Sequence, residues 1–127
     1  MSGPDGWVIE FYVADNGESP VRAFLAGLDA KTQARFLWSL EQLRIRNVQA
    51  RPPLVRHLED KLWELREESG TNIYRLLYVF FTGRRIVILH GLQKKTQRTP
   101  RREIETALAR IDRFVALEEA QKGERHE

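Results

Sequence analysis

The sequence contains no cysteine, so neither disulfide bonds nor thiolate metal ligands are available to it. No apolar run approaches the roughly 20 residues that a membrane-spanning helix needs, and the first residues lack the basic and apolar regions of a secretory signal. The sequence also lacks a Gly-rich phosphate loop, a serine-hydrolase motif and a metal-site spacing of His and carboxylates. These absences argue against a secreted disulfide protein, a membrane protein, a nucleoside triphosphatase, a serine hydrolase and a metalloenzyme. A cytoplasmic protein without metal or cofactor is expected.

Acidic residues are outnumbered by basic residues in one part of the chain. The 127 residues are 42% hydrophobic and 31% charged, which is enough for a single hydrophobic core. Residues 51–113 hold 14 Lys and Arg against eight Asp and Glu, while the rest of the chain has a slight acidic excess. Clustered cations recruit phosphates and other anions. A polyanionic partner is therefore expected, with nucleic acid first and an acidic protein segment second.

The first half of the chain predicts one strand and two helices. Residues 7–13 are rich in aromatic and β-branched side chains, which favour a strand. Ser19 and the following proline are typical of a helix start, and the apolar residues after them recur at helical spacing as far as Gly27 or Leu28. Asp29 is a second N-cap candidate, and the helix that it begins ends before the proline pair of "RNVQARPP".

The second half predicts three strands and a helix. The strands are "KLWELREE", "NIYRLLYVFF" and "RIVILHGL", and Gly83 in "TGR" permits the positive φ of a tight hairpin turn. A helix is expected from Arg101 to Leu117, and residues 118–127 are expected to form a frayed tail. The order predicts an α+β domain over residues 1–117, in which strand, helix and helix precede a three-stranded antiparallel meander and a C-terminal helix.

Three charged residues on two predicted strands are candidates for chemistry. Glu64 and Arg66 are two residues apart and therefore share one face of a strand. Arg75 lies inside an apolar strand, where an arginine is costly to bury unless it is paired or faces a cleft. Its role is either a structural ion pair, with Glu64 or another glutamate of the preceding strand, or contact with a ligand. Lys94 and Lys95 follow the third strand and add to the same positive region.

This combination suits the cleavage of RNA without metal. A 2′-hydroxyl group supplies its own nucleophile, so the protein has to orient it, move protons and stabilise the charge that develops on the phosphate. Arg66, Arg75 and the two lysines suit the electrostatic part. Glu64 or His90 could move protons, although a single histidine in an apolar run is also typical of a hydrogen-bonded structural residue.

Three fragments of the sequence together resemble a known toxin superfamily. "LEDKLWELR", "IYRLLYVF" and "IVILHGLQKKTQRTPRREIETALAR" are similar to the RelE/ParE superfamily, and within it to the phage Gp49-like, HigB-type branch of type II toxin-antitoxin systems. The resemblance runs from about Val8 to Phe114. It implies a RelE-like fold, mRNA cleavage without metal, usually on the ribosome, and a cognate antitoxin that often carries a helix-turn-helix domain.

The resemblance also implies roles for individual residues. Arg75 of "YRLLY" would contact the scissile phosphate, with Arg66 and the pair Lys94 and Lys95 as further catalytic cations. Glu64 stands where RelE has a lysine, so it is either a base or the partner of an arginine. Because no tyrosine follows Tyr78, a late tyrosine acid is excluded, and His90 or a lysine is left for the leaving group.

The expected function is therefore a toxin that acts as an mRNA endoribonuclease and inhibits translation and growth. Its expected partners are an antitoxin, mRNA and the ribosome. The alternative is a non-nucleolytic inhibitor of DNA gyrase of the ParE type, because such relatives share the fold. A further set of basic residues is expected to bind RNA or the ribosome: Arg84, Arg85, Arg98, Arg101 and Arg102.

Overall fold

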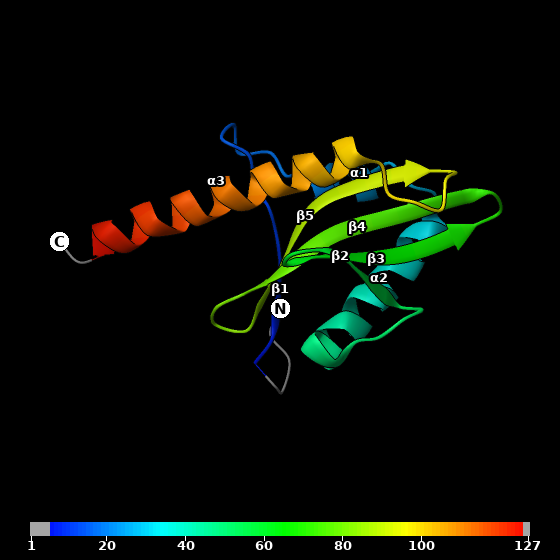
Figure 1. Ribbon diagram of the computed structural model, residues 1–127, viewed down its shortest axis with the longest axis horizontal. Helices are drawn as coiled ribbons and strands as arrows, with labels where there is room; N and C mark the ends of the chain where they lie inside the picture. Colours follow the sequence, from blue (N-terminus) through cyan, green and yellow to red (C-terminus); the bar gives the residue numbers. More distant parts are fainter. Residues whose placement is uncertain (1–5, 126–127) are drawn as a thin grey trace.

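The computed structural model of the protein describes residues 6–125, which form one sheet with helices on both of its faces (Figure 1). The elements of these residues, in chain order, are β1 (Val8–Phe11), α1 (Pro20–Ala26), α2 (Ala30–Arg46), the short 3-10 helix η1 (Asn47–Gln49), β2 (Val55–Glu59), β3 (Leu62–Ser69), β4 (Asn72–Phe81), β5 (Arg85–Lys94) and α3 (Arg101–Arg125). The predicted α+β class is confirmed.

The five strands have the order β1-β5-β4-β3-β2. Strands β2 to β5 form an antiparallel meander, and β1 pairs in parallel with β5 at one edge. The antiparallel succession predicted for β3, β4 and β5 is confirmed. The sequence prediction missed β2, which extends the meander to four strands and forms the other edge of the sheet.

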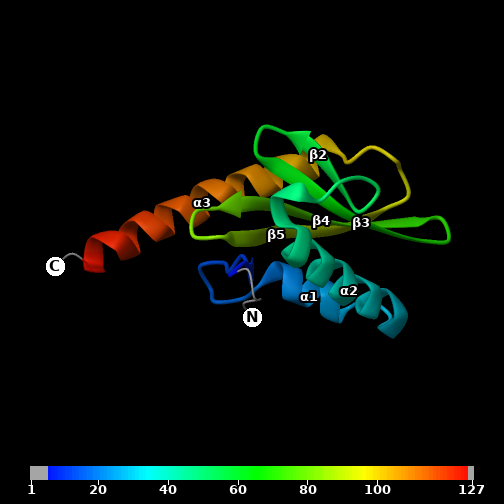
Figure 2. The ribbon, with the colours of Figure 1, turned by 90° about the horizontal axis from the view of Figure 1, so that it is seen from below.

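Figure 2 shows the sheet between two helical layers, with α1 and α2 on one side and α3 on the other. Each face of the sheet is therefore buried against its own set of apolar side chains. The core on the α1/α2 side includes Val21, Leu25, Phe36, Leu40, Leu43, Leu65, Leu76, Tyr78 and Ile88. The core on the α3 side includes Leu62, Leu77, Val79, Val87, Leu89, Leu92 and Ala107. Alternation along each strand distributes the side chains between these two cores.

Both predicted N-caps are confirmed. The Ser19 hydroxyl accepts a hydrogen bond of 3.3 Å from the backbone amide of Arg22, at the start of α1. The Asp29 carboxylate accepts the amide of Thr32 at 2.9 Å, and the threonine hydroxyl also donates to it. These bonds satisfy amides that the first turn of a helix leaves without a partner, and hydrogen bonding to Thr32 lowers the pKa of Asp29.

Two glycines shape the strand pair β4–β5. Gly83 has a φ of +82° in the turn, as its predicted role requires. Gly91 lies in β5 under the ring of Phe24 from α1, and a Cβ atom at Gly91 would lie 2.7 Å from the ring carbon Cγ. The missing side chain therefore lets α1 pack closely on the sheet.

The predicted end of the last helix was wrong, because α3 continues to Arg125. Figure 1 shows its C-terminal half extending beyond the sheet. Arg85 of β5 binds Glu118 of this half at 2.6 Å and Glu10 of β1 at 2.9 Å, while the rings of Phe81 and Phe114 make an edge contact with centroids 5.1 Å apart. These contacts hold the helix past the predicted end. Residues 126 and 127 of the predicted tail lie outside the described residues.

Candidate functional site

Arg66 and Arg75 are direct neighbours across β3 and β4. The register of the two antiparallel strands pairs them, and it places Glu64 two residues away on β3. Because residues two apart on a strand share a face, as do cross-strand partners, all three side chains project from the α3 side of the sheet. The predicted common face of Glu64 and Arg66 is confirmed by their ion pair of 2.8 Å.

The carboxylate of Glu64 is buried at the centre of this cluster. Both Glu64 and Arg75 have no exposed side-chain surface, and Arg75 Nε lies 3.4 Å from Glu64 Oε1. Arg66 Nε donates to Glu64 Oε2 at 3.0 Å, and the Thr99 hydroxyl donates to Oε1. Burial lowers the pKa of Arg75, and the negative charge of Glu64 opposes that shift. A buried charge requires such partners, so the structural ion pair predicted for Arg75 and Glu64 is present.

Arg75 also holds the segment between β5 and α3, which we call the β5–α3 loop (residues 95–100). Its terminal nitrogens donate to three successive backbone carbonyls, those of Thr96, Gln97 and Arg98, the last two at 3.0 and 3.4 Å. In this conformation the loop covers the guanidinium group. Direct contact between Arg75 and a phosphate therefore requires the loop to move.

Arg66 of β3 also forms hydrogen bonds with the β5–α3 loop. Its terminal nitrogens donate to the backbone carbonyl of Gln97 at 2.8 Å and to the side-chain oxygen of Gln97 at 3.1 Å. The Arg66 side chain keeps 13% of its surface exposed. Glu64, in contrast, has both oxygens engaged and no exposed surface. This arrangement suits Glu64 as a partner of arginines, and in this conformation its oxygens are not open to solvent.

His90 belongs to a second cluster, on β5 and α3. A bulge at Leu89 shifts the register and turns His90 towards the α3 side. His90 Nε2 lies 2.6 Å from Glu103 Oε1, and Nδ1 lies 3.0 Å from a terminal nitrogen of Arg110. Because a guanidinium group can only donate, Nδ1 must accept, so the ring is neutral with its proton on Nε2. Burial lowers the pKa of His90, in agreement with the neutral form.

The two candidate lysines at the end of β5 have different surroundings. Lys94 faces α3, where its amino group lies 3.8 Å from Glu103 Oε2. Lys95 is exposed in the β5–α3 loop and makes no ion pair with another described residue. Glu103 thus joins His90 and Lys94, a role that no sequence pattern indicated.

A groove lies between β2 and the start of α3, beside the cluster of Glu64. Its volume is about 440 Å³, and its lining residues are Arg56, His57, Leu58, Glu59, Arg98, Thr99, Arg101 and Ile104. Arg101 is paired with Glu59, with one contact of 3.2 Å. Arg56 and Arg98 are exposed and make no ion pair with another described residue. Arg98 and Arg101 are among the predicted contact residues, whereas Arg56 is not, because no motif surrounds it.

The remaining predicted contact residues are not gathered at this groove. Arg102 is exposed in the first turn of α3. Arg84 and Arg85 lie at the opposite end of β5 from the β5–α3 loop, roughly 30 Å away for a ten-residue strand. Arg85 is engaged by Glu10 and Glu118, and hydrogen bonding to these carboxylates raises its pKa. The structure therefore does not bring Arg84 and Arg85 together with the other candidates.

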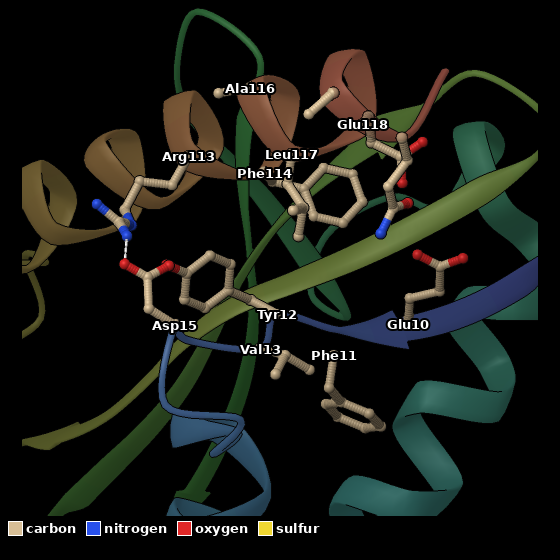
Figure 3. Close-up of a pocket in the computed structure, with 12 residues that line it drawn as sticks. Glu10, Phe11, Tyr12, Val13, Asp15, Arg113, Phe114, Ala116, Leu117 and Glu118 are labelled. Carbon is tan, nitrogen blue, oxygen red and sulfur yellow. Dashed lines mark hydrogen bonds and ion pairs between the residues drawn. The ribbon is translucent and has the colours of Figure 1, made fainter. Parts of the chain in front are cut away.

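Another pocket lies between β1 and the C-terminal half of α3 (Figure 3). Its volume is about 600 Å³, and its walls include Tyr12, Phe114 and Leu117. Arg113 and Asp15 face one another across its mouth as an ion pair. Its charged side chains are paired and its walls are largely apolar, so this pocket brings no set of groups together for phosphate chemistry.

Among residues 6–125, no group of three or more His, Cys, Asp or Glu is arranged to hold a metal ion. The helices of that region include none that is long and apolar enough to cross a membrane.

Residues 23–112 match the family described as phage derived protein Gp49-like. The chain belongs to this family. It is a family of RelE- and HigB-like toxins, so the resemblance seen in the sequence is confirmed. The matched region begins in α1 and ends within α3, and it contains the Glu64 cluster, the β5–α3 loop and the groove. No curated protein in the comparison matches the chain significantly.

Proposed function

We propose that this Gp49-like protein is the toxin of a type II toxin-antitoxin system and that it cleaves mRNA, inhibiting translation and growth. The observation that carries the proposal is the concentration of cations around Glu64 and the β5–α3 loop, on the α3 side of the sheet. Arg66, Lys95 and Arg98 are partly or fully exposed there. A phosphodiester that gains charge in the transition state is stabilised by such fixed cations.

The proposed reaction uses the substrate's own nucleophile. The 2′-oxygen of one nucleotide attacks the adjacent phosphorus and loses its proton to a base. The bond from phosphorus to the 5′-oxygen of the next nucleotide breaks, and that oxygen takes up a proton. The products are a 2′,3′-cyclic phosphate and a 5′-hydroxyl end. The protein must supply orientation, charge stabilisation and the two proton transfers.

The side chains divide between these tasks by their exposure. Among the predicted catalytic residues, Lys95, the partly exposed Lys94 and the exposed part of Arg66 are cations that a phosphate reaches without rearrangement. Arg75 and Glu64 act through the loop that they hold. Neutral His90 is able to accept a proton once its bond from Arg110 is exchanged for one from the substrate, and Lys95 is the second candidate for proton transfer.

The proposed partners follow from the family. A cognate antitoxin with a helix-turn-helix domain would neutralise the toxin, and the ribosome would present the mRNA. The groove carries the exposed arginines Arg56 and Arg98, and Arg102 is exposed in the first turn of α3. Such side chains suit a surface rich in RNA phosphates.

One observation favours a second candidate, a ParE-type inhibitor of DNA gyrase without nuclease activity. Arg75 and Glu64, two of the predicted catalytic residues, are fully buried, paired with one another and held by further protein groups. A side chain of that kind can be purely structural.

The two functions are separated by inducing the protein in bacterial cells and following one abundant mRNA by primer extension together with plasmid supercoiling. The nuclease predicts discrete new 5′ ends and unchanged supercoiling at the onset of growth arrest. A Lys94→Ala/Lys95→Ala variant should lose these ends, whereas Arg46→Ala, which changes an exposed arginine of α2, should keep them. Growth arrest with intact mRNA and relaxed plasmid would contradict the nuclease and support the gyrase inhibitor.

A further inference from the structure

Arg75, the residue expected to contact the scissile phosphate, is covered by the β5–α3 loop, while a positively charged groove beside it is open to solvent. Arg75 donates to the carbonyls of Gln97 and Arg98 and has no exposed surface. Beside it, Arg56 and Arg98 are exposed to solvent in the groove between β2 and the start of α3. An anion that approaches this face therefore meets the groove before it meets Arg75.

Arg56 and the Glu64 cluster share one face of the sheet. The register of β2 and β3 pairs Arg56 with Glu64 directly, so the arginine projects from the same side as Arg66 and Arg75. Arg56 is near enough to Arg75 to oppose its positive charge. The groove is thus continuous with the cluster that holds the β5–α3 loop.

Positive charge is in excess within the groove. Its three arginines face one carboxylate, that of Glu59, and Glu59 is occupied by Arg101. Arg56 and Arg98 are left without an acidic partner among the described residues. A groove lined by one sign of charge focuses its potential and raises the local concentration of the opposite ion. The amides that begin α3 add partial positive charge at the same place.

The lining favours a nucleic-acid backbone over an acidic protein. The apolar side chains that line the groove, Leu58 and Ile104, are partly buried, and none of the large apolar side chains that are exposed in the described structure lies in it. Protein interfaces take most of their binding energy from buried aromatic and aliphatic side chains. A sugar–phosphate backbone needs arginines and no apolar anchor.

We propose that this groove binds the sugar–phosphate backbone of single-stranded RNA, with Arg56 and Arg98 each contacting a phosphate, and that Arg75 is a positioning residue that holds the loop carrying Arg98. The proposal rests on the proposed ribonuclease function and specifies its substrate contact. It moves the first phosphate contact from the buried Arg75 to the exposed edge of the sheet at β2.

The test measures binding of a short 2′-O-methyl RNA by fluorescence anisotropy between low and moderate salt. This probe has no free 2′-hydroxyl groups, so binding is independent of cleavage. Each phosphate contact on a single strand contributes about −0.7 to the slope of log K against log salt. The double variant Arg56→Ala/Arg98→Ala should therefore lower the magnitude of the slope by about 1.4, and each single variant by about 0.7. Arg46→Ala should leave the slope unchanged.

A slope that is unchanged in the double variant would overturn the proposal, as would loss of binding to an acidic peptide while RNA binding is retained. Both arginines are exposed and lack ion pairs, so these variants should unfold at the wild-type temperature. The two proposals fail separately. If RNA binding depends on Arg56 and Arg98 but mRNA is never cut, the nuclease fails and the groove stands. If mRNA is cut and the slope is unaffected, the groove fails and the nuclease stands.

Discussion

Arg75 Nε lies 3.4 Å from Glu64 Oε1, and neither side chain has any surface exposed to solvent. This buried pair joins β3 to β4 and, through the bonds from Arg75 to backbone carbonyls, joins both strands to the β5–α3 loop. The first cluster of the candidate site is therefore arranged around a structural ion pair. Around this pair, the cations that reach the surface include Arg66, Lys94, Lys95 and the groove arginines.

Replacing the carboxylate of Glu64 should destabilise the protein strongly. Glu64→Gln leaves the buried guanidinium of Arg75 without its counter-charge, and breaking a buried pair in this way costs about 3–5 kcal/mol. The free energy of unfolding, measured by urea denaturation, should fall by that amount. Glu68→Gln is the matched control, because Glu68 is exposed on the same strand. Equal stability of the two variants would show that the ion pair does not anchor the fold.

The substitution Arg75→Lys should make the β5–α3 loop open more often, because lysine lacks the planar guanidinium group with its several donors. Lysine keeps the charge but cannot reach three carbonyls at once. A hydrogen bond from a charged group contributes about 1.5–3 kcal/mol, so losing one raises the open population roughly tenfold or more. Trypsin should therefore cut Arg75→Lys after Arg98 at least tenfold faster than it cuts the wild type. The Arg46→Lys control should be cut at the wild-type rate, and an equal rate in Arg75→Lys would argue against the clamp.

Stability should decline as the pH falls below about 6.5 because of His90. Burial lowers its pKa in the folded protein, and the nearby charge of Arg110 acts in the same direction, with Glu103 opposing. The unfolded chain therefore binds the proton first, and the contribution to stability is complete above about pH 6.5. It is lost as the pH falls from there through the folded-state pKa. The lowered pKa of Glu103 acts only below its ordinary value of 4.5.

The measurement compares free energies of unfolding at pH 7.5 and 5.5. The wild type should lose stability over this interval, and His90→Gln, which does not titrate, should lose less. His57→Gln serves as the control, since His57 is exposed and its ring lies against the carbonyl of Asp60 and the edge of Trp63. The same loss in His90→Gln as in the wild type would remove His90 from the pH response.

A methyl group at Gly91 should disturb the packing of α1. The added carbon would lie 2.7 Å from Cγ of Phe24, which is too close for either group to remain in place, and overpacking of this kind costs about 1–3 kcal/mol. Gly123→Ala is the matched control. Nothing lies near the added carbon there, and alanine in a helix is more stable than glycine by about 0.5–1 kcal/mol. Thermal unfolding should therefore shift in opposite directions for the two variants.

Local sequence signals predicted the elements that depend on local chemistry. The caps Ser19 and Asp29, the turn at Gly83 and the whole of β4 were found because their residue types determine backbone conformation over a few positions. β2 was missed because it is a short edge strand with polar side chains and no clear alternation. The last turns of α3 depend on Arg85, which is 33 residues away from Glu118, and no local pattern carries that information.

The site shows the same division. The sequence placed Glu64 and Arg66 on one face and offered Glu64 as a partner for Arg75, since a buried arginine needs an acid. The bonds from Arg66 and Arg75 to backbone carbonyls could not be predicted, because every residue has a carbonyl and no sequence pattern marks the ones that are used. Arg56 enters the groove only through its register with Glu64, which is a property of the folded sheet.

The central claim is that the protein cuts mRNA with the 2′-hydroxyl group as nucleophile, and sequencing of RNA ends after induction tests it most directly. Ends that carry a 5′-hydroxyl group should accumulate within mRNA coding regions in cells that express the wild type, and they should be absent with the Lys94→Ala/Lys95→Ala variant. Growth arrest without new ends, or new ends that carry a 5′-phosphate, would contradict the claim.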